Sequence, residues 1–217
     1  MMRLKRVYKS LFKKYGAQNW WPADSPFEVM VGAILTQNTA WINVEQALIN
    51  LKQAEALSPH IIINTAHDDL AEWLKPSGYF NVKAKRLKSF CHWYIQHDLY
   101  DGLKRQPSLK LREMLLSVKG IGPETADDIL LYAFERKVFV IDAYTRRIFC
   151  RLGMVDASLD YETLRLFFEN ELDAEDVTTF NEFHALIVIH AKNVCKKNPS
   201  CEICCLFSSC ERKGLIT

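Results

Sequence analysis

A helical hairpin near the middle of the chain limits what the sequence can fold into more than any other feature. The stretch SVKGIGPETADDILLYAF, residues 117–134, has an apolar helical pattern on each side of a Gly120-Ile121-Gly122 turn. Glycine reaches positive φ without a steric penalty, and Pro123 suits the first turn of a helix. We therefore expect two helices joined by a tight turn in which Ile121 points inward and locks them together.

The rest of the sequence also has helical spacing, which predicts an all-α fold. Apolar residues recur at helical intervals in eight further segments, namely 1–16, 24–37, 41–53, 67–75, 81–98, 108–118, 161–172 and 176–195. The run KVFVI, residues 137–141, is the one strand-like segment, and it is too isolated to build a sheet.

Size and hydropathy indicate a globular protein with a substantial core. The chain has 217 residues, of which 49% are hydrophobic. No apolar run approaches the roughly 20 residues that a membrane-spanning helix needs. The basic N-terminal segment has the spacing of an ordinary amphipathic helix and does not resemble a signal peptide. We expect a cytoplasmic protein that does not associate with a membrane.

Charge is unevenly distributed along the chain, although the net charge is only +2. Residues 1–14 carry six Lys or Arg and no acid, and residues 82–119 carry a net charge of +6. Such segregation can create a basic face for nucleic acid, or simply two solvated helix surfaces. Candidate phosphate contacts are Lys83, Lys85, Arg86, Lys88 and Lys119.

The glycine turn offers a second kind of phosphate contact. Backbone amides at the start of a helix point outward at the positive end of its dipole, so the helix after Gly122 could bind a phosphate without reading sequence. Gly120 and Gly122 would let a DNA backbone approach closely. The alternative is a plain helix–helix turn.

Five of the seven cysteines crowd into the C-terminal stretch CKKNPSCEICCLFSSC. Four of them have the spacing Cys195-x5-Cys201-x2-Cys204-x5-Cys210, and Cys205 is an alternative third ligand. In a cytoplasmic chain such spacing indicates a metal site and not disulfides. Zinc and a 4Fe–4S cluster are both compatible with four thiolates.

The hairpin, the segment VIDAYTRRI and the cysteine tail together resemble the helix-hairpin-helix DNA glycosylases of the endonuclease III superfamily, from about Ser25 to Cys210. The resemblance implies two helical subdomains: 1–24 with 136–194, and 25–135, which holds the helix-hairpin-helix at about 108–134. A cluster loop, 195–217, follows. The resemblance favours a 4Fe–4S cluster over zinc, although the first two cysteine ligands are separated by six residues in the family and by five in this chain.

The same resemblance assigns roles to two acidic residues. Asp142 takes the position of the catalytic aspartate, although it could also simply cap the helix that follows. Bifunctional members carry a nucleophilic lysine two residues after the second glycine, where this chain has Glu124. A carboxylate cannot form a Schiff base, so the resemblance implies a monofunctional glycosylase that leaves an abasic site.

The base pocket is expected from aromatic residues near the N-terminus. The motifs NWWPAD and LTQNTAW look like those of the bacterial 3-methyladenine glycosylases within the superfamily, which implies removal of an alkylated purine. The pocket residues are then Trp20, Trp21, Pro22, Trp41 and Glu124, although the tryptophans could equally pack in a core. The resemblance to the superfamily as a whole implies that Gln37, in the loop at the end of the predicted helix 24–37, fills the gap that a flipped nucleotide leaves.

The expected partner is double-stranded DNA with damaged bases, bound by a monomer. Two other functions remain open. The chain could be a monofunctional glycosylase for mispaired uracil, thymine or adenine, or a non-catalytic iron–sulfur protein that binds DNA.

Overall fold

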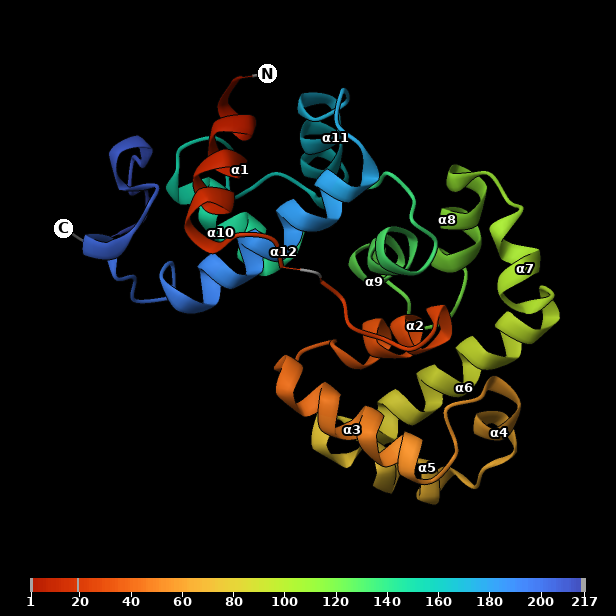
Figure 1. The fold of residues 1–217 in the computed structure, drawn as a ribbon. Coiled ribbons are helices and arrows are strands. Elements are labelled where there is room, and N and C mark those ends of the chain that lie inside the picture. Colours follow the sequence, from red (N-terminus) through yellow and green to blue (C-terminus); the bar gives the residue numbers. More distant parts are fainter. Residues whose placement is uncertain (1, 19, 216–217) are drawn as a thin grey trace. The chain divides into compact units, whose positions relative to one another are not determined.

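The computed structural model describes residues 2–18 and 20–215, which form two compact helical units (Figure 1). Unit 1 joins Met1–Pro22 to Lys137–Thr217, and unit 2 is the intervening segment Ala23–Arg136. Among the described residues neither unit contains a strand, and the prediction of an all-α fold is confirmed.

The segment KVFVI is extended and has no strand partner within the described chain. Its side chains from Val138 to Ile141 are buried, so it crosses the core of unit 1 as a connecting segment. The sequence predicted a subdomain over residues 25–135, and the corresponding unit 2 of the structure spans Ala23–Arg136. The cysteine loop, predicted as a separate segment, belongs to unit 1.

Unit 2 is built from short helices that pack around one buried helix. Its elements are α2 (Pro26–Leu35), α3 (Trp41–Gln53), α4 (Pro59–Asn64), α5 (His67–Leu74), the 3-10 turn η1 (Lys75–Ser77), α6 (Phe80–Gln96), α7 (Leu99–Lys104), α8 (Ser108–Leu116), α9 (Pro123–Asp128) and the π-helical turn η2 (Ile129–Ala133). The six-residue helices α4 and α7 were not predicted, because so few residues show no clear helical period.

Helix α2 is the centre of unit 2, as its nearly continuous apolar sequence predicts. Every residue from Phe27 to Leu35 is buried, and the helix packs against α3, α6, α9 and η2. The Ser25 side chain caps its first turn by accepting a hydrogen bond from the Glu28 amide at 3.2 Å. The cap satisfies one of the backbone amides that have no partner within the helix.

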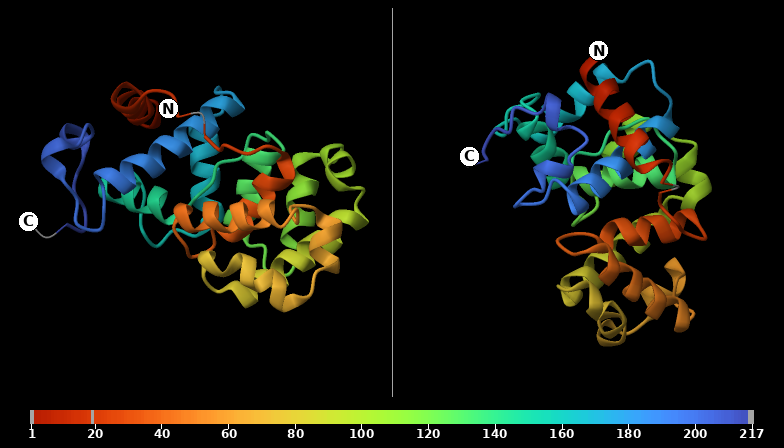
Figure 2. Two further views of the ribbon diagram at one scale, coloured as in Figure 1. Left: turned by 60° about the horizontal axis from the view of Figure 1, so that its bottom comes forward. Right: turned by 60° about the vertical axis from the view of Figure 1, so that its left-hand side comes forward.

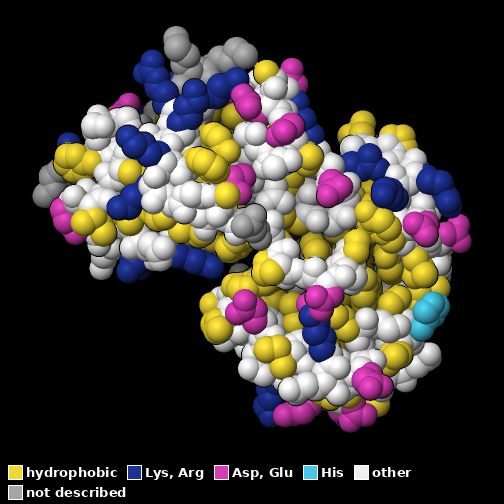
Figure 3. All heavy atoms as spheres, in the orientation of Figure 1, with side chains coloured by type: hydrophobic (Ala, Val, Ile, Leu, Met, Phe, Trp, Pro, Cys, Tyr) yellow, Lys and Arg dark blue, Asp and Glu magenta, His cyan; other side chains and the backbone are white. Residues whose placement is uncertain are grey.

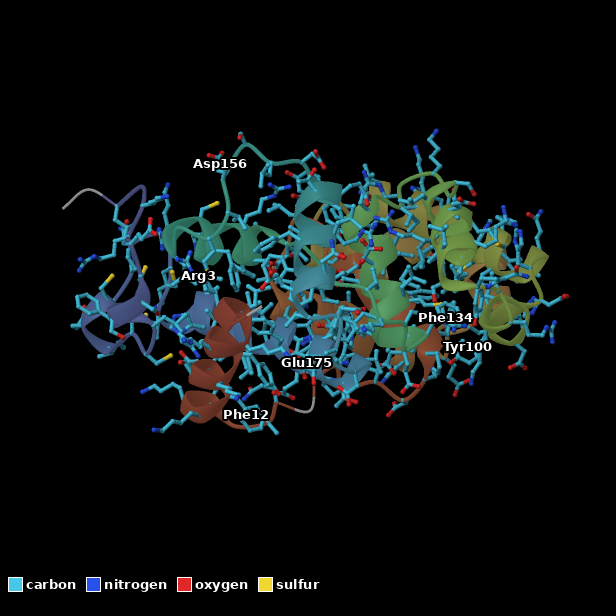
Figure 4. All side chains as sticks on the ribbon, turned by 90° about the horizontal axis from the view of Figure 1, so that it is seen from above. Arg3, Phe12, Tyr100, Phe134, Asp156 and Glu175 are labelled. Atoms are coloured by element: carbon cyan, nitrogen blue, oxygen red, sulfur yellow. The ribbon has the colours of Figure 1, made fainter. Side chains whose placement is uncertain are left out.

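The hairpin consists of α8 and α9, and an internal ion pair holds the two helices together. Arg112 on α8 donates to both carboxylate oxygens of Asp127 on α9, at 2.7 and 3.0 Å. The Asp127 side chain is fully buried. Beyond η2, Phe134 stacks on Tyr100 with ring centroids 5.0 Å apart, which fixes the end of the hairpin against α7 (Figure 4).

Unit 1 contains α1 (Met2–Tyr15), α10 (Ala143–Arg151), α11 (Tyr161–Glu171), α12 (Val177–Asn193) and the short 3-10 turns η3 (Cys201–Ile203) and η4 (Phe207–Ser209). Helix α12 runs beside both α1 and α10 (Figure 2). Aromatic rings fill the space between these helices. Phe139 stacks on Phe168 at 4.5 Å and meets Phe183 of α12 edge-on at 5.8 Å.

Helix α1 covers α12 with its apolar side and presents its basic side to solvent. Leu4, Val7 and Leu11 are buried, and Lys and Arg side chains gather over the helix in Figure 3. Its end is tied to α12, where the Tyr15 hydroxyl lies 2.8 Å from Nδ1 of His190. No helix in the described residues has the length and apolar character needed to cross a membrane.

The Arg112–Asp127 pair gives a prediction about stability. Replacing Arg112 with Met leaves the buried Asp127 carboxylate without its guanidinium partner, which should lower the free energy of unfolding by about 3–5 kcal/mol. The measurement is denaturant unfolding. The control is Lys110→Met, which breaks an exposed pair with Glu113 on the same helix and should cost at most about 1 kcal/mol. Equal losses from the two variants would contradict a structural role for the buried pair.

Candidate functional site

Asp142 stands at the start of α10 with both of its carboxylate oxygens engaged. Oδ1 accepts a hydrogen bond from the Thr145 amide at 2.6 Å, which makes Asp142 the N-cap. Oδ2 lies 3.7 Å from Nε2 of His184, a residue of α12. The Asp142 side chain is 14% exposed and that of His184 is 7% exposed. Capping and a second interaction therefore coexist on one carboxylate.

The surroundings of Asp142 keep it ionised. Burial alone would raise the pKa of this carboxyl group, but the nearby imidazole of His184 and the hydrogen bond from the Thr145 amide act against it. The net result is a pKa below the ordinary value. At neutral pH, unit 1 therefore holds a carboxylate anion in a largely water-excluded position.

Two other helices in unit 1 start in the same way and serve as an internal comparison. Asp160 caps α11 through the Thr163 amide at 2.8 Å, and Asp176 caps α12 through the Thr179 amide, also at 2.8 Å. Asp160 is exposed, whereas Asp142 is largely buried beside an imidazole. All three aspartates therefore cap a helix, and Asp142 differs from the other two in its burial beside an imidazole.

The hairpin turn in unit 2 has a closed side and an open side. Gly120 has a φ of +94°, and an added Cβ would lie 2.5 Å from the Arg86 side chain. Gly122 has nothing within 4 Å of such a Cβ, so the space before α9 is open. Ile121 is 6% exposed and Pro123 is at the start of α9, both as predicted. The exposed Lys119 and Glu124 flank the turn.

Gln37 lies in the turn after α2 and is hydrogen-bonded to the hairpin within the same unit. Its Nε2 donates to the Gly120 carbonyl at 3.0 Å and to Oγ1 of Thr125 at 2.9 Å. Arg86 on α6 donates to the Gln37 amide oxygen. The residue expected to fill the DNA gap thus connects its own loop to the hairpin and to α6.

The basic residues of α6 do not all face solvent, which differs from our expectation that they contact phosphates together. Lys85 is exposed. Lys83 is 1% exposed, and its Nζ donates to the carbonyls of Leu35 and Ser77. Burial, followed by the neighbouring Arg86 charge, lowers the Lys83 pKa to about 8.

Lys88 has a similar arrangement further along α6. Its Nζ donates to the Thr65 carbonyl and, at 3.4 Å, to the Ile63 carbonyl. Ile63 lies in the last turn of α4, and Thr65 directly follows that helix. Lys83 and Lys88 are therefore directed at backbone carbonyls, which leaves Lys85 as the solvent-facing lysine of the three.

The aromatic residues proposed for the pocket belong to both units. In unit 1, Trp20 and Trp21 are half-buried and Pro22 is exposed. The Nζ of Lys192 lies over the Trp20 ring, 5.9 Å from its centroid, so that ring face already attracts a cation. In unit 2, Trp41 is half-buried, and its indole nitrogen donates to Glu45 at 2.7 Å.

The C-terminal cysteines are half-buried and lie close together in unit 1. Burial, together with nearby cysteines that include Cys195 and Cys210, raises the pKa of Cys204 to about 11, although the hydrogen bond from the Leu206 amide acts in the opposite direction. N–H groups point at two sulfurs: Arg151 donates to Cys195 at 3.3 Å, and the Leu206 amide donates to Cys204 at 3.4 Å. Donors of this kind suit sulfur ligands that carry negative charge.

Arg151, the last residue of α10, binds the cysteine loop at several further points. Its guanidinium donates to the carbonyls of Lys196 and Lys197 at 2.6 and 2.8 Å. The fourth thiol, Cys210, donates to the Arg151 carbonyl at 3.3 Å. Within the described residues, no three side chains of the His, Cys, Asp or Glu type converge as they would around a single metal ion.

Comparison with known proteins places this arrangement in a family. Residues 31–173 match the model of the HhH-GPD superfamily base excision DNA repair proteins. The chain belongs to this superfamily. It is 44% identical to a Methanocaldococcus jannaschii protein whose assigned name is that of a DNA repair glycosylase, with 96% of each chain covered. It is also 28% identical to endonuclease III of Sulfolobus acidocaldarius, over 85% of this chain and 81% of the relative.

Solved structures agree with the family assignment. The 3-methyladenine DNA glycosylase of Helicobacter pylori, solved with 1,N6-ethenoadenine, is 32% identical with a TM-score of 0.75, over 87% of this chain and 95% of that one. An endonuclease III–DNA complex matches with a TM-score of 0.80 over 98% of both chains, and its 20% identity supports the fold alone. This HhH-GPD protein is a helix-hairpin-helix DNA glycosylase of base excision repair.

Sequence reasoning missed the position of His184 beside Asp142, and it missed an exposed aromatic side chain, Tyr79. His184 lies in the apolar run FHALIVIH, where it is indistinguishable from a core histidine. Tyr79 follows Gly78 at the start of α6, has a φ of +47° and is 71% exposed. A large aromatic side chain next to a glycine, just before a basic helix, was the signal that could have identified it.

Proposed function

We propose that this glycosylase is monofunctional and removes an alkylated purine such as 3-methyladenine, leaving an abasic site. The observation that carries the proposal is the ionised Asp142, held by Thr145 and His184, in a chain with Glu124 at the position of the family's lysine. The 32% identity to a structure named a 3-methyladenine glycosylase supports the choice of substrate.

Removal of an alkylated purine requires no general acid, and it therefore suits a site whose proposed catalytic group is the Asp142 carboxylate. Alkylation at N3 or N7 makes the purine cationic and weakens its glycosidic bond, so the leaving base needs little protonation. The base must first leave the stack, and a cationic ring between tryptophans gains roughly 0.5–2 kcal/mol of cation–π attraction. Trp20, Trp21 and Trp41, with Pro22 and Glu124, are the pocket residues we propose.

Asp142 would act on the sugar once the base is flipped. As the glycosidic bond lengthens, positive charge develops on the sugar, and a carboxylate anion stabilises it electrostatically. The same carboxylate can orient the attacking water. The Thr145 amide fixes one oxygen by a hydrogen bond, and His184 lies 3.7 Å from the other, so the anion needs little reorganisation at the moment of reaction.

DNA contacts would come from unit 2. The open space at Gly122 and the exposed Lys119 suit a phosphate at the hairpin, and Lys85 adds a solvent-facing charge. Gln37 would fill the gap after exchanging its hydrogen bonds to the hairpin for bonds to DNA. We expect a monomer to bind the duplex.

The cysteine loop would hold a 4Fe–4S cluster through Cys195, Cys201, Cys204 and Cys210, with zinc as the alternative. The N–H donors aimed at Cys195 and Cys204 fit this role. We assign the cluster no part in base removal. It would order the loop that carries Lys196 and Lys197, whose carbonyls already bind Arg151.

The substrate proposal is tested on genomic DNA treated with a methylating agent. The wild type should release methylated purines, identified by chromatography. Asp142→Asn should reduce release by about 10²–10³-fold or more, with near-normal DNA binding, because it removes the charge opposite the developing cation. The matched control is Asp160→Asn, which alters the same kind of cap on an exposed residue and should retain full activity.

Other products would redirect the proposal. Release of uracil, thymine or adenine from defined mispaired duplexes, with methylated purines untouched, would indicate a mismatch glycosylase. Duplex binding without release of any base would indicate a non-catalytic DNA-binding protein.

The position of Glu124 gives a prediction about strand cleavage. Water must attack the sugar when no lysine does, so the products should be intact abasic strands that break only on heating or in alkali. Borohydride should trap no adduct with the wild type. Glu124→Lys should gain weak cleavage and a trappable adduct, because a nearby amine can form a Schiff base. Efficient trapping of the unmodified enzyme would disprove the monofunctional assignment, and Lys119→Gln would then test the nearest candidate amine.

The cofactor proposal is tested by colour and metal content. Purified wild type should be golden-brown with about four irons per chain, and Ala at Cys195, Cys201 or Cys210 should give colourless, poorly soluble protein. Cys204→Ala and Cys205→Ala identify the third ligand, and we expect loss of colour from the former only. Cys91→Ala is the control in the core. A colourless wild type with about one zinc per chain would contradict the cluster.

A further inference from the structure

Lys83 is a charged side chain in a place where charge is costly. It is among the largest fully buried side chains of the described structure, with 1% exposure. Its Nζ donates to the Leu35 carbonyl at 2.8 Å and to the Ser77 carbonyl at 2.6 Å. A buried charge is costly unless hydrogen bonds compensate for its lost solvation, and these two carbonyls supply them.

The two carbonyls mark the starts of two surface segments. Leu35 is the last residue of α2, and the turn that follows, residues 36–40, carries Gln37. Ser77 ends η1 and precedes Gly78 and Tyr79, which both have positive φ. Carbonyls at helix ends lack partners within their helix, and a cation at the C-terminus of a helix is favourable. The Lys83 ammonium group therefore binds the residue at which each of the two segments begins.

Arg86 extends this connection one helical turn further along α6. It donates to the amide oxygen of Gln37, whose Nε2 donates to Gly120 in the hairpin. Lys83 therefore holds the start of the Gln37 turn, and Arg86 holds its side chain. The second segment presents the Tyr79 ring, which is 71% exposed.

We propose that Lys83 is a positioning residue that fixes the spacing between residues 36–40 and residues 77–79, so that both segments engage the same distorted site in DNA. The inference rests on the proposed role of Gln37 at the gap left by a flipped nucleotide. Lys83 itself contacts no DNA. Its loss should reduce recognition of a gap in the base stack and leave attraction to the phosphate backbone intact.

The experiment compares two duplexes, one undamaged and one with a tetrahydrofuran abasic analogue. Lys83→Met should weaken binding to the abasic duplex at least about tenfold, while affinity for the undamaged duplex and its salt dependence stay unchanged. The control is Arg136→Met, which removes another cation that donates to backbone carbonyls of unit 2, those of Lys104 and Gln106. It should leave the ratio of the two affinities unchanged.

A second set of variants separates positioning from stability. Lys83→Gln retains two N–H donors with a shorter reach, so it tests the same contact if the Met variant does not fold. In a Gln37→Ala/Tyr79→Ala background, Lys83→Gln should reduce the affinity ratio no further, because the segments that it positions have lost their side chains.

Two outcomes would overturn the inference. One is a folded Lys83 variant with an unchanged affinity ratio. The other is a loss of equal size in the wild-type and Gln37→Ala/Tyr79→Ala backgrounds. The probe carries no base at the lesion, so failure to release methylated purines would disprove the proposed substrate without affecting this test.

Discussion

The ends of helices are the constraint on which this structure depends. Each α-helix leaves four amides and four carbonyls without partners, and a chain made of many short helices has many such ends. Side chains satisfy them here: Asp142 caps α10, and Lys83 binds the last carbonyl of α2. The open amides before α9 are left for a ligand. In this protein a group that completes a helix, Asp142, is also the group proposed to act on the sugar.

The features that could be predicted from sequence are local ones. The glycine turn, the inward Ile121 and the start of α9 at Pro123 all follow from backbone preferences of a few residues. The buried α2 follows from its apolar run. Asp142 could be recognised as a cap for the same reason, since the capping Thr145 amide lies three residues away.

What could not be predicted depends on contacts between distant segments. Lys83 reads as one of several surface lysines, because its partner at Leu35 lies 48 residues away and is a backbone carbonyl with no sequence signature. The sequence around His184 predicts an ordinary core residue. Its position beside Asp142, which is 42 positions earlier in the chain, is visible only in the structure. Arg86 was expected to face DNA, and its amide partner Gln37 was visible only in three dimensions.

The route of the chain has a consequence for how the protein is made. Unit 1 is assembled from segments before and after unit 2, and the bond between Tyr15 and His190 joins residues 175 positions apart. On a ribosome, α1 emerges long before α12, so its apolar face of Leu4, Val7 and Leu11 stays uncovered while all of unit 2 is synthesised. Domains tend to fold as units during synthesis. We therefore expect the unit with the hairpin to fold first, and the unit with Asp142 to be completed last.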